Sequence, residues 1–526
     1  MKILHNAHIH TLDASTPTAS VLVIDRERII AVGGLELLEQ FPFAEKIDLG
    51  GRFVLPGLTD AHIHMQWYSL GLQKVDCETD TREECLRRVA ERAGVTPPGE
   101  WILGHGWQQN DWGGGEFPSA AQLDATAPDH PVYLTAKSLH AGWANSAALK
   151  LAGITAATVN PENGKILHDV DGNPNGILLE TAMELLDDAL PAVTLEQVVK
   201  AIQAAQSLLW KMGLTGVHDF DQRLCFMAMQ VLHQRGDLKL RVTKSIPVEL
   251  LQQAHELGLR SGFGDDMLQV GSVKVFMDGA LGPRTAAMFQ PYLNEPDNRG
   301  ILNMDGEELF EIGRQAVETG LSLAVHAIGD RANHEVLDAF EQMRRYEHEK
   351  NLPHFRHRIE HVQILHADDA ARLGKLGVIA SMQPIHATSD MLAADKFWGE
   401  RSALAYAWRT QLLNGAVLAF GSDAPVESPN PFLGLHASVT RRRADGTPSP
   451  QGWFPEQRLS MLEAWQGFTS GAAYAGGMEN RLGKLSAGYY ADLIVLEKDP
   501  LTCEPDELLK MQSSATMVNG EWVWQA

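Results

Sequence analysis

Short apolar runs, each followed by a stretch with helical periodicity, fill most of the chain. This alternation is typical of parallel βα units, in which a buried strand is followed by a helix that covers the sheet. Eight such runs occur, at residues 53–61, 214–219, 238–246, 273–277, 321–327, 357–362, 378–382 and 417–421. Eight strands with intervening helices predict an α/β fold with a TIM (β/α)8 barrel, whose chemistry lies at the carboxyl ends of the strands.

Both ends of the chain have a different pattern. Residues 1–52 alternate short β-rich runs (21–24 and 28–32) with turn residues, and residues 481–526 contain two further runs (491–496 and 516–523). Asn519-Gly520, within the last run, is a strong signal for a β-hairpin. These patterns predict a small β-sandwich built from both chain termini.

A long interval separates the first two barrel runs. The barrel is predicted to start over residues 53–70 and to resume over 206–480, which leaves residues 71–205 between them. This interval is far longer than a βα connection, so it is predicted to be an insertion. Its apolar run at 132–135 and its helix-like stretch at 184–190 indicate a folded lid subdomain rather than a disordered loop.

The composition argues against several classes of partner. The 526 residues are 44% hydrophobic, which is ordinary for a globular protein, and 67 acidic against 44 basic residues give a formal net charge of -23. Such a charge repels nucleic acid and anionic membranes, and the short basic cluster at 441–443 does not reverse it. No run approaches the roughly 20 apolar residues that span a bilayer. The expected partner is therefore a small-molecule substrate.

The cysteines and the first residues bear on location. The four cysteines show no CxxC spacing, and the first residues lack the apolar stretch of a secretory signal. We therefore expect a cytoplasmic protein without a disulfide framework. A homodimer is the expected assembly only because symmetric dimers are the commonest oligomers.

Two His-x-His pairs stand out among the polar residues. Residues two apart on a strand face the same side, so His62 and His64, at the end of the first predicted barrel strand, can point together at one metal ion. The spacing alone is weak evidence, because His8 and His10 have the same spacing near the N-terminus. There we expect two histidines on the solvent face of an edge strand.

Other potential ligands stand where later barrel strands are predicted to end. His326 closes the run 321–326, His361 closes 358–361, and Asp423 follows 420–422. A single histidine in such a place is more often an ordinary polar residue than a ligand. Four histidines and an aspartate at strand ends would all have to be ordinary polar residues by coincidence. Together they therefore predict a metal centre.

These positions, together with the segment PGLTDA (56–61) before the first pair, resemble the amidohydrolase superfamily. Further segments resemble its YtcJ-like branch, which includes N-substituted formamide deformylases: GHGW (104–107), HAGWANS (140–146), VKVFMDGALGPRTA (273–286) and HAIGD (326–330). The stretch from GKL (483–485) to LIV (493–495) is similar to the closing part of the superfamily's β-sandwich. The resemblance covers nearly the whole chain.

The resemblance implies a centre of two divalent metal ions. The implied ligands are His62, His64 and Asp423 for the more buried metal, and His326 and His361 for the second. Imidazole and carboxylate ligands suit zinc, the expected metal, but also manganese, iron, cobalt or nickel.

Lys274 stands where binuclear members of the superfamily carry a lysine carboxylated by CO2, whose carbamate bridges both metals. A free ammonium has no lone pair to donate, whereas a carbamate offers two anionic oxygens. The resemblance therefore implies a carboxylated Lys274 as the bridging ligand. The alternative is an unmodified Lys274 that pairs with Asp278 or Asp423.

Four residues are candidates for substrate contact: Trp107 and His140 in the predicted insertion, Arg284 after the fourth strand, and His386 after the seventh. Each has a structural alternative. Aromatic and histidine side chains pack domain interfaces as readily as they line pockets, and Arg284 could bridge a loop instead of holding a substrate carboxylate.

The predicted function is hydrolysis of an amide-type C–N bond in a small molecule by metal-bound hydroxide, as in an amidase or an N-substituted formamide deformylase. Metal binding lowers the pKa of water from about 15.7 toward neutrality. Asp423 would take up the remaining proton on attack and return it to the departing nitrogen. A cyclic amide, a lactone or a phosphoester stays open as the substrate, because pocket shape selects among them. The other alternative is a non-catalytic metal-binding scaffold.

Overall fold

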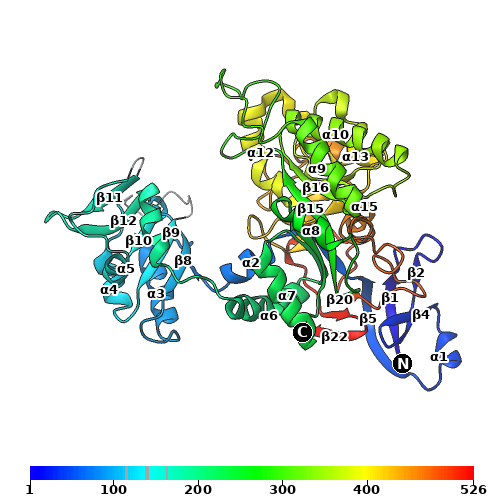
Figure 1. Ribbon diagram of the computed structural model, residues 1–526. Coiled ribbons are helices and arrows are strands. Elements are labelled where there is room, and N and C mark those ends of the chain that lie inside the picture. Colours follow the sequence, from blue (N-terminus) through cyan, green and yellow to red (C-terminus); the bar gives the residue numbers. More distant parts are fainter. Residues whose placement is uncertain (113–115, 137–140, 162–163) are drawn as a thin grey trace. The chain divides into compact units, whose positions relative to one another are not determined.

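The computed structural model describes residues 1–112, 116–136, 141–161 and 164–526 (Figure 1). The chain forms two compact units. One contains Met1–Tyr68 and Ile202–Ala526, and the other contains Ser69–Ala201. Among the described residues, no helix is both long and apolar enough to cross a membrane.

A parallel eight-stranded sheet forms the centre of the first unit. Its strands follow one another in chain order. They are β6 (Leu58–Ile63), β13 (Leu214–Asp219), β14 (Arg241–Pro247), β15 (Leu268–Phe276), β16 (Leu323–Ala327), β17 (Arg358–His361), β18 (Ile379–Met382) and β19 (Leu418–Phe420). A parallel bridge between Ile63 and Ala424 brings the segment after β19 back beside β6. The sheet is thus a nearly closed barrel, and the predicted TIM barrel is confirmed.

Helices follow the barrel strands, as Figure 1 shows for α9 (Gly306–Thr319) and α10 (Asp330–Glu349). On α10, Val336, Phe340 and Met343 are completely buried, because spacings of four and three place them on one face. The Asp305 side chain caps the start of α9, and Gly320, with a φ of 97°, ends it. The other helices of this unit are α2 (Met65–Gly71), α6 (Leu195–Lys211), α7 (Arg223–Arg235), α8 (Leu251–Leu257), α11 (Arg372–Leu376), α12 (Pro384–Trp398), α13 (Trp408–Leu413), α14 (Pro431–Thr440), α15 (Met461–Gln466) and α16 (Ala472–Ala475).

Both ends of the chain build one mixed sheet, in which β5 pairs with N-terminal and C-terminal strands alike. Its strands are β1 (Lys2–His10), β2 (Thr18–Ala19), β3 (Val21–Asp25), β4 (Arg28–Gly33), β5 (Glu45–Pro56), β20 (Leu493–Leu496), β21 (Ala515–Val518) and β22 (Glu521–Gln525), with the short α1 (Leu37–Gln40) between β4 and β5. Leu4, Leu493 and Met517 share one apolar cluster. Asn519 and Gly520 have positive φ angles of 55° and 75°, as a type I′ hairpin turn requires. As predicted, both termini build one β structure, which is a single mixed sheet in which their strands pair; the predicted sandwich boundaries stay a prediction.

The predicted first barrel strand, residues 53–61, is in fact parts of two strands. β5 ends at Pro56 in the terminal sheet, and β6 begins at Leu58 in the barrel. The chain changes sheets at Gly57, where a Cβ atom would lie 2.3 Å from the Thr215 side chain. The apolar pattern did not reveal this break because both sheets bury their part of the run.

The prediction for the N-terminal pair, His8 and His10, was half right. His8 is exposed to solvent and His10 is half-buried. The edge position was wrong, because β1 lies inside the sheet between β3 and β5. Its neighbour β5 comes about 40 residues later in the chain, so no local pattern could show that β1 is covered on that side.

The second unit contains a six-stranded sheet of its own. Its elements are β7 (Val75–Asp76), α3 (Arg82–Ala93), β8 (Ile102–Trp107), α4 (Ala120–Thr126), β9 (Val132–Ala136), β10 (Ala141–Ala144), α5 (Ser146–Leu151), β11 (Gly164–His168) and β12 (Pro174–Glu180), and a 3₁₀ helix over Thr181–Ala189. Leu123, Ile177 and Trp143 are completely buried in its core. A lid role for this unit stays a prediction.

Candidate metal centre

The predicted ligands lie where barrel strands end. His62 is on β6 and His64 directly follows it, His326 and His361 are on β16 and β17, and Asp423 follows β19. All eight strands are parallel and lie side by side, so their carboxyl ends share one rim of the barrel. Ligands that are up to 361 positions apart in the chain therefore come from a single rim.

Backbone conformation brings two of these ligands into place. His361 and Asp423 have positive φ angles of 76° and 60°, which residues other than glycine adopt rarely and which are enriched at active sites. The Asp423 N–H donates to the His62 carbonyl at 2.7 Å. The Asp60 carboxylate accepts the N–H groups of His62 and Ser422, both at 3.0 Å. These bonds join the ends of β6 and β19, the first and last strands of the barrel.

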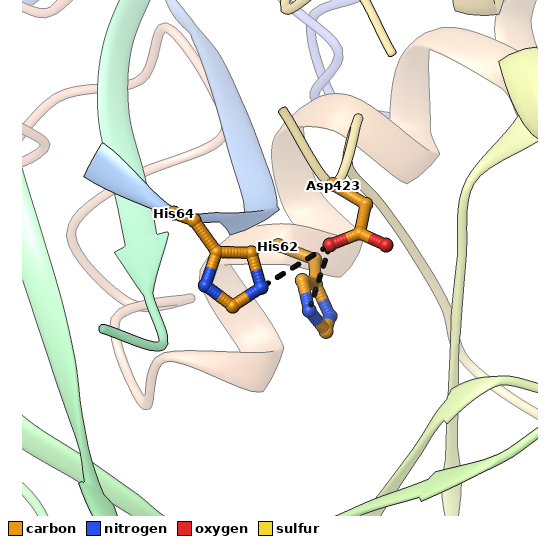
Figure 2. A group of neighbouring side chains, drawn as sticks. All are labelled: His62, His64 and Asp423. Atoms are coloured by element: carbon orange, nitrogen blue, oxygen red, sulfur yellow. Dashed lines mark ion pairs between the residues drawn. The ribbon is translucent and has the colours of Figure 1, made fainter. Parts of the chain in front are cut away.

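His62, His64 and Asp423 point toward one another (Figure 2). The Nε2 atoms of His62 and His64 lie 3.5 and 3.4 Å from Asp423 Oδ1. Ligand atoms at about 2.0–2.2 Å from a tetrahedral zinc ion lie roughly 3.3–3.6 Å from each other. The spacing therefore fits a single metal ion held by these three side chains.

The other nitrogen of each histidine is anchored. His62 Nδ1 donates to Glu360 Oε2 at 2.5 Å, and His64 Nδ1 donates to Asp221 Oδ1 at 3.0 Å. A carboxylate can only accept, so Nδ1 carries the proton in both rings. In both rings Nε2 is the nitrogen that points toward Asp423, and it is the one left for a metal ion.

A second group of possible ligands consists of His361, His386 and Asp423, whose ligand atoms all lie within 4.8 Å of one another. His361 Nδ1 donates to Gln383 Oε1 at 2.8 Å, which leaves its Nε2 free. His386 is buried, and its Nε2 lies 3.9 Å from Asp423 Oδ2. In the described part of the chain this Nε2 has no hydrogen-bond partner. The structure thus brings the predicted substrate contact His386 to the predicted metal ligands.

His326 lies beside this group on the neighbouring strand. Its ring centre is 4.5 Å from that of His361. Its Nε2 lies 3.0 Å from the Gly279 carbonyl oxygen, to which it donates. Nδ1 of His326 is therefore the nitrogen left to bind a metal. Adjacent strands bring together the two histidines predicted for the second metal.

Lys274 is buried on β15. Its Nζ lies 4.6 Å from the centre of the Phe220 ring and 4.8 Å from that of Phe276. Burial lowers the pKa of Lys274 to about 8. The Asp278 carboxylate accepts backbone N–H groups and does not pair with the lysine. An amine that is readily neutral is the form that reacts with CO2, so the surroundings suit carboxylation, which stays a prediction.

The charges at the centre suit a cation. Burial and the nearby Lys274 lower the pKa of His62 to about 4, so its imidazole is neutral. Burial would raise the pKa of Asp423, but His62 and its neighbours outweigh it and hold that pKa well below its usual range. Burial opposes charge on His64, but hydrogen bonds to Asp221 and Asp423 raise the pKa of His64 to about 9. The two carboxylates around His64 thus favour positive charge at this position, which a divalent ion would also supply.

The remaining substrate candidates lie elsewhere. Trp107 is completely buried in the core of the second unit, where its Nε1 donates to the Leu134 carbonyl at 2.8 Å. Arg284 forms an ion pair with Glu295 on a surface loop. Both therefore have the contacts of structural residues, and their predicted substrate roles stay predictions. His140 lies outside the described residues.

Sequence reasoning missed the partners of the ligands. Glu360 directly precedes His361 in the chain, and Asp221 follows the end of β13 by two residues. The available signal was positional, because an acidic residue at the end of a predicted barrel strand points to the same rim as the ligands. Which histidine each carboxylate meets depends on contacts across the barrel.

Comparison with known proteins agrees with this geometry. The sequence matches the Amidohydrolase family over residues 45–524. It is 31% identical to YtcJ of Bacillus subtilis, with 99% of both chains covered. It is 29% identical to the N-substituted formamide deformylase of Arthrobacter pascens, with 98% of this chain and 96% of the relative covered.

Among solved structures, a metal-dependent hydrolase of Pyrococcus horikoshii superposes with a TM-score of 0.80 at 30% identity, covering 96% of this chain and 99% of that one. These matches confirm the resemblance that the ligand spacing and the flanking motifs carried. The chain belongs to the amidohydrolase family.

Proposed function

We propose that this protein uses metal ions to hydrolyse an amide-type C–N bond in a small molecule. The observation that carries the proposal is that His62, His64 and Asp423 lie at the spacing of metal ligands. They come from the ends of β6 and β19, the first and the last strand of the barrel. An N-substituted formamide is the substrate class we favour, because a full-length relative from Arthrobacter pascens is an N-substituted formamide deformylase.

The chain's own residues would hold two divalent ions, for which zinc is our proposal because imidazole and carboxylate donors suit it. His62, His64 and Asp423 would bind the first, and His326 and His361 the second. Lys274, once carboxylated, would bridge them. When bound, such ions make a water molecule acidic near neutral pH and polarise a carbonyl oxygen.

Asp423 is the proposed proton carrier. Neighbouring histidines hold the pKa of Asp423 well below its usual range, although burial alone would raise it, so the carboxylate is ionised and can accept a proton. It would take the proton of the attacking water and return it to the departing nitrogen, because an amine leaves readily only when protonated.

His386 is the proposed contact to the substrate. Its buried Nε2 lacks a hydrogen-bond partner among the described residues, and a buried polar atom without a partner is costly. A polar atom of the bound substrate would satisfy it beside Asp423. Its distance of 3.9 Å from Asp423 Oδ2 leaves it within reach of the same substrate group.

The test is metal analysis of the purified protein together with a panel of amides and N-substituted formamides. We expect two divalent ions per chain and turnover of at least one panel member. A chelator should abolish the turnover, and zinc should restore it. A protein that binds no metal and turns over no substrate would contradict the proposal and favour a scaffold.

A further inference from the structure

A buried arginine and glutamate lie beneath the candidate metal centre, inside the barrel. Arg358 and Glu360 are two residues apart on β17 and so face the same side of the strand. Their side chains are 3% and 0% exposed, and Arg358 Nε lies 2.5 Å from Glu360 Oε1. The two side chains thus form a buried ion pair inside the barrel.

Glu360 is held from several sides. Its Oε2 accepts from Ser381 Oγ at 2.6 Å and from Arg358 Nη2 at 3.0 Å. Arg358 itself donates to the Ala61 carbonyl at 2.7 Å and contacts His218 Nδ1 at 2.9 Å. These bonds link β17 to β6, β13 and β18, so the carboxylate has little freedom to move.

The fixed oxygen of Glu360 meets the first ligand. Oε2 lies 2.5 Å from His62 Nδ1, and His62 Nε2 lies on the opposite side of the ring, 3.5 Å from Asp423 Oδ1. A carboxylate at Nδ1 fixes the tautomer and the ring orientation of a ligand histidine and makes its Nε2 a better donor.

We propose that Glu360, anchored by Arg358, is a positioning residue that sets the metal affinity of the centre through His62. This inference rests on the proposed metal-dependent function. It assigns to the arginine and glutamate a role beyond filling the barrel interior. If Glu360 is replaced by a neutral residue or displaced, the His62 ring is free to rotate or to change tautomer. Metal binding would then weaken although every metal ligand is still present.

The chain offers a matched control. Buried Glu347 and His357 form a second set of the same three residue types with the partly buried Arg344. His357 Nε2 lies 2.8 Å from Glu347 Oε1, and Arg344 Nη1 lies 2.7 Å from Glu347 Oε2. Here the other ring nitrogen, Nδ1, accepts the Leu323 backbone N–H at 3.0 Å. His357 precedes β17, at the end of the strand opposite to His361, so this set can affect stability but not metal binding.

The experiment compares Glu360→Gln with Glu347→Gln in the full chain. Zinc affinity is measured by competition with a chromophoric chelator, and the absorption spectrum of the cobalt-substituted protein reports ligand geometry. We expect Glu360→Gln to bind zinc about 10- to 100-fold more weakly and to show an altered cobalt spectrum. Glu347→Gln should lower the free energy of unfolding while zinc affinity and the cobalt spectrum stay those of the wild type.

Wild-type zinc affinity and an unchanged cobalt spectrum in Glu360→Gln would overturn the inference and leave the proposed function intact. Equal losses of affinity in both variants would also overturn it, because they would reflect general loosening. A wild-type protein without metal would instead overturn the proposed function together with the inference. If Glu360→Gln does not fold, Glu360→Asp takes its place. It keeps the charge but shortens the reach to His62, so a several-fold loss is expected and unchanged affinity would overturn the inference.

Discussion

Two His-x-His pairs with the same spacing have different surroundings in this protein. His62 and His64 each have one ring nitrogen on a carboxylate and the other within 3.5 Å of Asp423. His8 is exposed and stacks on Phe53 with ring centres 5.0 Å apart. His10 Nε2 lies 3.1 Å from Asp499 Oδ1, and no further ion pair involves His8 or His10 among the described residues.

The difference shows that a short motif supplies donors but does not by itself make a site. The pair at the end of β6 becomes a candidate ligand set because Asp423, from another part of the barrel rim, lies beside it as a third ligand. Glu360 and Asp221 hold the two rings by hydrogen bonds. The pair on β1 belongs to no such group of possible ligands in the part of the chain that the structure describes. What distinguishes the two is supplied by residues distant in the chain.

The largest effect on turnover should come from substitution of Asp423, which lies next to both His62 and His64. Asp423→Asn removes both a ligand and the proposed proton acceptor, while the amide has nearly the same shape. We expect turnover to fall by about 10³-fold, within the range for loss of general acid–base catalysis. Steady-state kinetics measure this loss, and circular dichroism should show an unchanged fold. Near-normal turnover would contradict the role given to Asp423.

The two pairs can be compared directly by alanine substitution. His62→Ala should weaken zinc binding by more than about 100-fold, because losing a ligand costs more than losing one of its hydrogen-bond partners. His8→Ala should leave zinc affinity unchanged. Competition with a chelator measures the zinc affinity of both variants. Equal effects of the two substitutions would mean that spacing alone determines the site.

Burial also makes the barrel histidines sensitive to acid. Burial and Arg358 lower the pKa of His218 to about 3, and burial lowers the pKa of His357 to about 4. In the unfolded chain the pKa of a histidine is near 6.5, so below this pH the unfolded state binds protons that the folded state does not. The folded state is therefore fully stabilised above pH 6.5 and loses this stabilisation as the pH falls toward 4. We expect the metal-free protein to lose about 2 kcal/mol of unfolding free energy per histidine between pH 7 and pH 5. Urea unfolding at both pH values measures it, and equal free energies would contradict the burial of neutral imidazoles.

The smallest effect on zinc affinity should come from substitution of Asp221, the hydrogen-bond partner of His64. Asp221 lies 3.0 Å from His64 Nδ1, and the His64 side chain is 15% exposed, so this anchor is looser than that of His62. Asp221→Asn keeps an acceptor oxygen but removes the charge. Zinc affinity should fall by about tenfold, the lower end of the range for such partners. Chelator competition measures this change, and a loss larger than that of Glu360→Gln would reverse the ranking of the two anchors.

The sequence could predict the barrel and the position of the candidate ligands at its strand ends because both signals are local. A buried parallel strand is a continuous apolar run, and a ligand at its end is a polar residue just after that run. The same reasoning failed at Gly57, where one apolar run serves two sheets. It also failed for β1, whose neighbour β5 is remote in the chain.

The partners of the ligands could not be predicted, for a geometric reason. Glu360 is on β17 and His62 on β6, and these strands are not neighbours in the barrel sheet. Their side chains meet across the interior, where contacts depend on the radius and the stagger of the barrel. Trp107 illustrates the opposite difficulty. Its aromatic character suited a pocket and a core equally, and its described contacts are those of a core.

The most direct test of the account is a crystal structure of the zinc-loaded protein with anomalous diffraction recorded at the zinc edge. We expect an anomalous peak within bonding distance of Nε2 of His62, Nε2 of His64 and the carboxylate of Asp423. A zinc-loaded crystal with no peak among these three side chains would contradict it.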